Sequence, residues 1–156
     1  WDALAHYLWL SLRALVDARD RGVNRATPII LHTYHLPVPR PSGVAGARAG
    51  WLWPACERYD IPGDERPVLA QALFARLRAL WLAADADSGS AGALPGVHVF
   101  DSAAVTDIEP AVPVSKGVSG DWQNEIHLTP AGYRQLGRPM AAWLWTLLRE
   151  RYGHPS

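Results

Sequence analysis

The fold of this chain is decided by the stretch Pro28-Ile29-Ile30-Leu31-His32-Thr33-Tyr34. The stretch is short, apolar and β-rich, and such a run is typical of a strand buried on both faces in a parallel sheet. A second strand of the same kind is predicted for Val97-His98-Val99-Phe100-Asp101. Helical patterns lie before, between and after the two runs. Strands that alternate with helices indicate a parallel α/β sheet.

Three helices are predicted where apolar residues recur every three or four positions. The first covers residues 2–20 and ends at Gly22, after a basic last turn. The second covers residues 65–84. The third begins at Thr129, a favourable N-cap residue, with Pro130 in its first turn. The apolar stripes are Leu4, Leu8, Leu12, Leu15 and Val16 in the first helix, Leu69, Leu73, Leu77, Leu80 and Trp81 in the second, and Leu136, Met140, Trp143, Leu144 and Leu147 in the third.

The segments between these elements contain many helix and strand breakers. Residues 35–63 hold five prolines and several glycines, and they are predicted to form a long loop, which is often functional in a compact domain. Within it, Trp51 and Trp53 either wall a pocket for an acyl group or only anchor the loop. Residues 85–96 are rich in small residues and are predicted to be a mobile connector. Residues 102–126 are predicted to be irregular.

Composition narrows the class of protein. The 156 residues fit one domain, and 49% hydrophobic and 19% charged residues exclude a disordered chain. Fifteen basic residues balance fifteen acidic ones, so no basic surface for nucleic acid is expected. No apolar run approaches the roughly 20 residues of a membrane span, and none is predicted. Cys56 is the single cysteine, which excludes internal disulfides, and we expect it to be a buried bystander.

The start of the sequence suggests that part of the domain precedes it. The chain begins with Trp1 rather than Met and enters a helical pattern almost at once. Two parallel strands rarely stand alone, so further strands are expected upstream. An isolated sheet of this width would expose an apolar edge, and we expect the isolated chain to be marginally stable or prone to aggregation.

Candidate functional residues follow both predicted strands. Tyr34, His35 and Asp101 stand at the strand ends. Ligands of open α/β sheets bind beyond the carboxyl ends of the strands, which makes this edge a candidate site.

The most informative candidate is His127, two residues before the capped last helix. A histidine held at such a place can accept and return a proton at neutral pH. The alternative is a surface histidine that only bonds to its neighbours. The stretch around it is Asp121-Trp122-Gln123-Asn124-Glu125-Ile126-His127-Leu128-Thr129-Pro130-Ala131-Gly132-Tyr133.

This stretch resembles the last motif of the SGNH/GDSL hydrolase superfamily of esterases and lipases, with His127 in the position of the catalytic histidine. Trp122 to Thr129 is similar to the Trp-x-Asn-Glu-[Ile/Leu]-His-Pro-Thr version of one bacterial branch, apart from Leu128. Three other landmarks of that branch occur in the same order. They are His32-Thr33-Tyr34-His35-Leu36-Pro37, Gly50-Trp51-Leu52 and Val97-His98-Val99-Phe100-Asp101.

The resemblance implies a fold and a reaction. The fold would be the flavodoxin-like, three-layer parallel α/β sheet of that superfamily. The reaction would be hydrolysis of a small-molecule or lipid ester by a serine esterase, with His127 as general base and then general acid, and without a metal or other cofactor. The Gly-Asp-Ser nucleophile block does not occur in this sequence. Residues 1–156 would therefore be a single partial domain, inactive without a preceding N-terminal segment.

The partner of His127 in the catalytic triad has three candidates. Asn124 stands where the common motif has aspartate. An amide oxygen can orient the imidazole but carries no charge to stabilise its cation. Asp121 and Asp101 are alternative acids, and the branch pattern favours Asn124 as orienter with another acid assisting. Tyr34, His35, Trp51 and Trp53 are the expected substrate-binding residues.

Two other functions remain open. The first is a degenerate, non-catalytic α/β module that binds a ligand or partner through its aromatic loop. It is favoured by Asn124 in place of an acid and by the lack of a nucleophile motif. The second is a metal hydrolase that uses His32, His35, His98 and Asp101, although residues three apart on a strand point to opposite faces.

Overall fold

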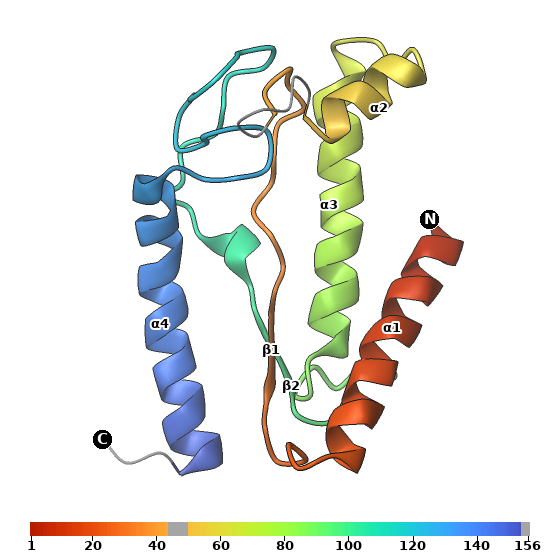
Figure 1. Cartoon of the computed structure of the whole chain (residues 1–156), viewed down its shortest axis with the longest axis vertical. Helices are drawn as coiled ribbons and strands as arrows, with labels where there is room; N and C mark the ends of the chain where they lie inside the picture. Colours follow the sequence, from red (N-terminus) through yellow and green to blue (C-terminus); the bar gives the residue numbers. More distant parts are fainter. Residues whose placement is uncertain (44–49, 154–156) are drawn as a thin grey trace. The chain divides into compact units, whose positions relative to one another are not determined.

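The computed structural model describes residues 1–43 and 50–153 (Figure 1). Its elements in chain order are α1 (Asp2–Arg21), β1 (Ile29–His32), α2 (Leu52–Arg58), α3 (Glu65–Ala84), β2 (Val97–Phe100), a 3₁₀ turn (Ser102–Ala104) and α4 (Pro130–Tyr152). The three predicted helices and both predicted strands are confirmed. The helix α2 is an addition, because it lies inside the segment predicted to be a loop. Residues 44–49 of that loop are outside the described residues.

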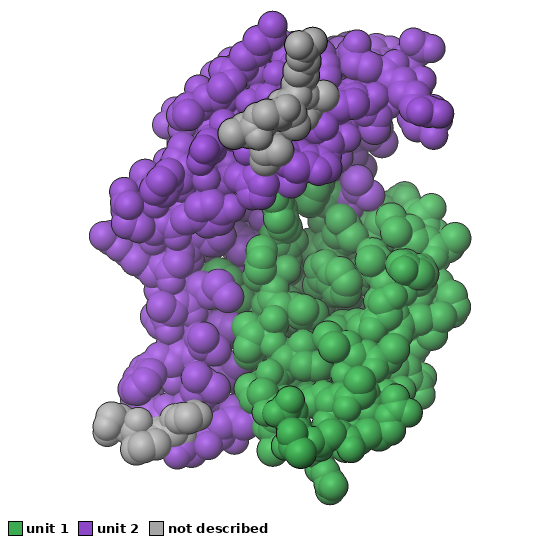
Figure 2. Space-filling model, in the orientation of Figure 1, with its two compact units in different colours: residues 1–34, 74–101 green, residues 35–73, 102–156 purple. Residues whose placement is uncertain are grey.

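The chain divides into two compact units, each assembled from two separate stretches of sequence (Figure 2). Unit 1 consists of residues 1–34 and 74–101, and unit 2 of residues 35–73 and 102–156. Each unit has its own apolar cluster.

The two strands lie in unit 1 and pair in parallel, from Ile29 opposite Val97 to His32 opposite Phe100. This pairing confirms the predicted strand direction. The predicted three-layer parallel sheet is wrong. The described part of the chain has four helices and a two-stranded sheet, with about 50% of residues helical and 7% in strands.

The hydrogen bonds of β2 explain why the sheet stops there on one side. Ala86 N–H donates to Val97 C=O over 2.8 Å, and Val99 N–H donates to the Asp85 carboxylate over 2.7 Å. The segment that follows α3 therefore takes the backbone groups with which a third strand would pair. The sequence pattern predicts that β2 is buried, but it does not tell whether a strand or a turn covers its edge.

The core of unit 1 lies on one face of the strand pair. Val97 and Val99 of β2 pack with Leu12 and Val16 of α1. Alternate residues of a strand share a face, so the odd-numbered strand residues form this contact. The remaining members of the cluster are Ala84, Leu94, Trp9, Ile29, Leu31, Trp81 and Leu82.

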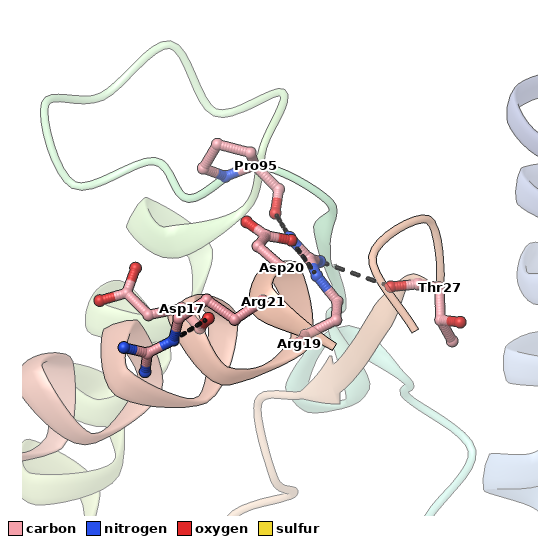
Figure 3. Close-up of polar contacts among 6 residues, drawn as sticks. All are labelled: Asp17, Arg19, Asp20, Arg21, Thr27 and Pro95. Carbon is pink, nitrogen blue, oxygen red and sulfur yellow. Dashed lines mark hydrogen bonds and ion pairs between the residues drawn. The ribbon is translucent and has the colours of Figure 1, made fainter. Parts of the chain in front are cut away.

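The predicted stripe of α1 is only partly buried. Leu12 and Val16 are buried, whereas Leu4 and Leu15 are 45% and 54% exposed. The stripe spans a wider arc of the helix than its contact with the core of unit 1 covers. The end of α1 is held by Arg19, whose guanidinium donates to Pro95 C=O over 2.8 Å (Figure 3).

Among the described residues, one helix, α3, is long and apolar enough to cross a membrane by length and composition alone, with a mean hydropathy of 1.2. Its last turns contribute Trp81, Leu82 and Ala84 to the core of unit 1. Arg78, in the same half of the helix, forms an ion pair with Asp101 at 2.5 Å. Only 11% of its apolar window is buried, so these contacts do not test the prediction that the chain has no membrane span.

Unit 2 is organised around Trp122, whose side chain is 1% exposed. Ile108, Ala111 and Leu128 form a buried cluster with it, and Val38, Val105 and Leu136 pack against this cluster. Single β-bridges join Trp122 to Ser119 and to Leu128. The irregular residues before α4 are thus fixed by one large aromatic side chain.

Replacement of Asp85 by alanine tests the account of the β2 edge. In Asp85→Ala the buried Val99 N–H loses its acceptor, and we expect the free energy of unfolding to fall by about 2 kcal/mol. Urea denaturation followed by far-UV circular dichroism measures this change. The control is Asp17→Ala on the exposed surface of α1, for which a change below about 0.5 kcal/mol is expected. Equal stability of the two variants would contradict the account.

Candidate functional site

The segment that carries His127 is fixed at both ends within unit 2. Thr129 N–H donates to Asp121 C=O over 2.7 Å, which closes the segment into a loop. The Thr129 hydroxyl accepts from Gly132 N–H over 3.1 Å and caps α4, as the sequence predicts. His127 therefore lies in a loop that is anchored to a long helix.

A buried carboxylate, that of Glu125, connects this loop to α2. Its side chain is 0% exposed and accepts hydrogen bonds from four backbone N–H groups. Three of these donors are consecutive, Trp51, Leu52 and Trp53, with distances of 2.7 Å for both Leu52 and Trp53. These N–H groups belong to the start of α2, where a helix leaves its donors unpaired and favours a negative charge. Two sequence landmarks, Gly50-Trp51-Leu52 and Asn124-Glu125-Ile126-His127, thus meet in space.

Two further residues shape the surroundings of this carboxylate. A Cβ atom at Gly50 would collide with the Glu125 side chain, so glycine is required there. Arg40 donates its own N–H to Glu125 over 3.1 Å, and its 0% exposed guanidinium donates to Gly117 C=O over 2.6 Å and to Trp122 C=O over 3.2 Å. Burial lowers the pKa of the Arg40 guanidinium, and the charge of Glu125 raises it in turn.

The ring of His127 is half-buried and is held on one nitrogen. Its Nδ1 lies 3.2 Å from Nδ2 of Asn124. The ring also meets the indole of Trp51 edge-on, with ring centroids 5.7 Å apart. No other described residue bonds to the imidazole, so Nε2 is available to a ligand.

The orientation of Asn124 determines which nitrogen of His127 carries the proton. The amide oxygen of Asn124 accepts from the N–H groups of Ile126 at 3.0 Å and His127 at 2.8 Å. The amide nitrogen, a donor, is therefore the atom that faces Nδ1. Nδ1 must then be the acceptor, and the neutral ring carries its proton on Nε2. A general base that receives a proton on Nε2 needs the opposite tautomer.

Asp121, the acid of the same loop that was predicted to assist His127, binds another residue. The Asp121 carboxylate accepts from Glu109 N–H over 2.8 Å. Gly120, beside it, has a positive φ of 54° and packs so closely on Pro110 C=O that a Cβ atom would lie 2.5 Å from that oxygen. In the described residues Asp121 thus fastens the 109–121 turn, and no hydrogen bond joins its carboxylate to the imidazole.

The expected substrate-binding residues of unit 2 have different contacts. Trp51 lies against His127, but the indole of Trp53 lies beneath the Arg66 guanidinium at 4.3 Å. His35 points its Nε2 at Val105 C=O, 3.0 Å away, and packs against Trp122. Its Nδ1 is buried and has no hydrogen-bond partner among the described residues.

Tyr34 belongs to unit 1 and has an unusual backbone. Its φ of 67° lies in the left-handed region, which is uncommon for a residue other than glycine. The N–H of Tyr34 donates to Nδ1 of His32, and its ring stacks on His32 and contacts Phe74. These local contacts hold the strained conformation directly after β1.

The residues of the metal alternative do not form a single cluster in the described chain. His32, His98 and Asp101 are in unit 1, and Asp101 is bound by Arg78 and by the Thr33 hydroxyl. This contact raises the pKa of Arg78. A different group, Asp85, Asp87 and His98, brings three potential ligand atoms within 4.8 Å of one another. Both Asp85 oxygens already accept backbone N–H groups, which accounts for its position without a metal.

Sequence reasoning did not assign a role to Glu125 or Arg40. The sequence carries no sign that their side chains are buried. Glu125 is a charged residue inside the quoted motif, and Arg40 lies between two prolines in a predicted loop. Charged residues are rarely fully buried unless they are paired, so a sequence alone does not indicate burial at such positions.

Comparison of the chain with protein-family models, with curated proteins and with solved structures finds no match.

Glu125→Gln tests the role of the buried carboxylate. The variant places an amide nitrogen against two backbone donors and leaves the buried Arg40 guanidinium without its nearby negative charge. We expect the free energy of unfolding to fall by about 3 kcal/mol. Urea denaturation followed by tryptophan fluorescence measures it. Glu57→Gln removes the 53% exposed partner of Arg66 and serves as the control, with an expected loss below about 1 kcal/mol. A loss no larger than that of the control would show that Glu125 is not the anchor of this loop.

Asn124→Asp tests the tautomer of His127. The substitution is isosteric and keeps the oxygen that accepts from Ile126 and His127, but it turns the atom facing Nδ1 into an acceptor. The ring proton should move from Nε2 to Nδ1. ¹⁵N chemical shifts of the neutral imidazole distinguish the two tautomers. A parent chain that already carries the proton on Nδ1 would refute the arrangement described here.

Proposed function

We propose that this chain carries the proton-transfer histidine of a carboxylic-ester hydrolase, His127. The observation that supports the proposal is a half-buried imidazole that is held at Nδ1 by Asn124 and flanked by Trp51, with Nε2 open to a ligand. A general base needs this combination of a fixed ring and one accessible nitrogen. The ordered landmarks around His32, Gly50, Val97 and Asn124, which resemble the SGNH/GDSL hydrolases, give the proposal its reaction class.

The nucleophile of this proposal lies outside the 156 residues. No serine or cysteine side chain of residues 1–43 and 50–153 bonds to His127. A serine hydroxyl from elsewhere in the complete protein would attack the ester carbonyl, and Nε2 would take the hydroxyl proton. The imidazolium then protonates the leaving alcohol, and an acyl-enzyme forms. Water, activated by the same nitrogen, attacks this intermediate and releases the carboxylic acid.

Asn124 imposes a condition on this cycle. Nε2 accepts a proton only when the ring proton resides on Nδ1, and the Asn124 amide must then present its oxygen to Nδ1. Turning the amide over gives up its hydrogen bonds from Ile126 and His127, each worth about 1 kcal/mol. An asparagine in this role also supplies no charge to the imidazolium, and in a Ser-His-Asp enzyme the loss of the carboxylate costs about 10⁴ in turnover.

The same observation favours a second candidate, a non-catalytic binding function. With the amide in its described orientation, Nε2–H is a hydrogen-bond donor. A neutral imidazole of this kind binds a carbonyl or carboxylate oxygen without taking a proton. The choice between hydrolase and binding module therefore depends on whether a serine nucleophile reaches Nε2.

Activity of the full-length product of the gene distinguishes the two functions. We expect a fluorophosphonate probe to label a serine outside residues 1–156, and the protein to hydrolyse p-nitrophenyl butyrate. His127→Ala should lower kcat by at least about 10³-fold, because the hydroxyl then has no base. His6→Ala, on the exposed face of α1, is the matched control and should leave kcat unchanged. A folded protein with no labelled serine, or a His127→Ala variant of full activity, would favour the binding module.

A further inference from the structure

Unit 2 contains an open apolar groove between α2 and the first half of α3. Its volume is about 220 Å³ and its wall is almost entirely hydrocarbon. Figure 1 shows α2 beside the start of α3. Residues of both helices line the groove. The wall includes Leu52 and Cys56 from α2, Leu69, Ala70 and Leu73 from α3, and Ile61 between the helices.

Polar contacts link the two helices beside the groove. The Arg66 side chain donates to Ile61 C=O over 2.9 Å, forms an ion pair with Glu57 at 2.5 Å and stacks on Trp53. The Glu125 carboxylate accepts hydrogen bonds from the first N–H groups of α2 and holds the start of that helix. The frame of the groove is therefore set without filling the space between its apolar walls.

Two residues at the groove leave it accessible. Leu69 is 50% exposed and Tyr59 is 72% exposed, although both side chains contribute to its wall. A ligand can therefore place an apolar part between the helices while its polar end stays in solvent. Arg66 also lines the groove, but its guanidinium is already bound by Glu57 and by Ile61 C=O, so the wall exposes hardly any polar atom to the polar end of a ligand.

The volume limits the size of the apolar part. An enclosed cavity of about 150 Å³ holds benzene, so by the same ratio the open groove of about 220 Å³ has room for roughly eight carbon atoms, and further carbons would extend into solvent. Leu52 lines the groove, and its N–H donates to the Glu125 carboxylate. Glu125 lies two residues before His127 in the sequence. A hydrocarbon chain in the groove would thus belong to the same part of unit 2 as the proton-transfer residue.

We propose that this groove binds the straight hydrocarbon chain of a carboxylic ester, or of the acid that ester hydrolysis releases, up to about eight carbons long. The assignment of the ester rests on the proposed function, whereas binding of the chain does not. The groove thereby defines the substrate class as medium-chain acyl compounds.

Protection of Cys56 from N-ethylmaleimide tests the proposal on the unmodified chain. Cys56 is the single cysteine of the sequence, and its side chain lines the groove. Burial raises the pKa of its thiol, so we expect slow modification of the free chain. Because the side chain lines the groove, an occupant should slow the modification further. The probes are the straight-chain carboxylates from butanoate to dodecanoate, each below its critical micelle concentration, and mass spectrometry gives the rate of modification.

We expect the affinity derived from protection to rise about two- to fourfold per methylene and to level off near octanoate, where the groove is full. Leu69→Gln replaces an exposed wall residue and should weaken octanoate binding at least tenfold. Val68→Gln, at the neighbouring exposed position outside the groove, should leave it within twofold. The proposal is overturned by a lack of protection at every length, by affinity that keeps rising through dodecanoate, or by equal effects of the two variants.

The result is independent of catalysis. Protection is measured without turnover, so it stands even if no serine hydrolase activity is found in the full-length protein. Conversely, the full-length protein could hydrolyse acetyl esters while Cys56 stays unprotected. That result would refute acyl binding in the groove and leave the hydrolase proposal intact.

Discussion

The carboxylate of Glu125 is the constraint on which the rest of unit 2 depends. Taking a carboxylate fully out of water costs several kcal/mol unless hydrogen bonds replace its hydration. Here four backbone donors replace it, three of them from the unpaired start of α2. This single group therefore sets where α2 begins, which way Trp51 faces and how the loop bearing His127 is held. The apolar groove has the same origin, because one of its walls is the helix that Glu125 fixes.

Local patterns were sufficient to predict the helices α1, α3 and α4 and the strands β1 and β2. The spacing of Leu12 and Val16, the cap at Thr129 and the β-rich run before Tyr34 depend on residues close in sequence, and all three were found where expected. The extent of the sheet depends instead on contacts between distant residues. Asp85 and Ala86 bind the edge of β2, and nothing in their sequence distinguishes them from other residues of a small-residue connector. The helix α2 was missed for a similar reason, since its start is stabilised by a carboxylate more than seventy residues away.

The candidate site shows the same division. The sequence indicated that His127 and Asn124 lie together, because they are three residues apart in one loop before a capped helix. It could not show which end of the Asn124 amide faces the imidazole, since that depends on the backbone N–H groups of Ile126 and His127 in the folded loop. Nor could it show that Asp121 serves the Glu109 turn, or that His35 packs on Trp122. The sequence indicated which residues could take part in the site, whereas the orientation of their side chains depends on the fold.

The dependence on Glu125 also explains the placement of prolines in the segment 35–63. Arg40 lies between Pro39 and Pro41, and Pro54 directly follows Trp53. A proline has no N–H, so one at position 40, 51, 52 or 53 would remove a donor to the carboxylate. Two prolines flank Arg40 and one follows Trp53, so they restrict the backbone next to the donors and leave all four N–H groups in place.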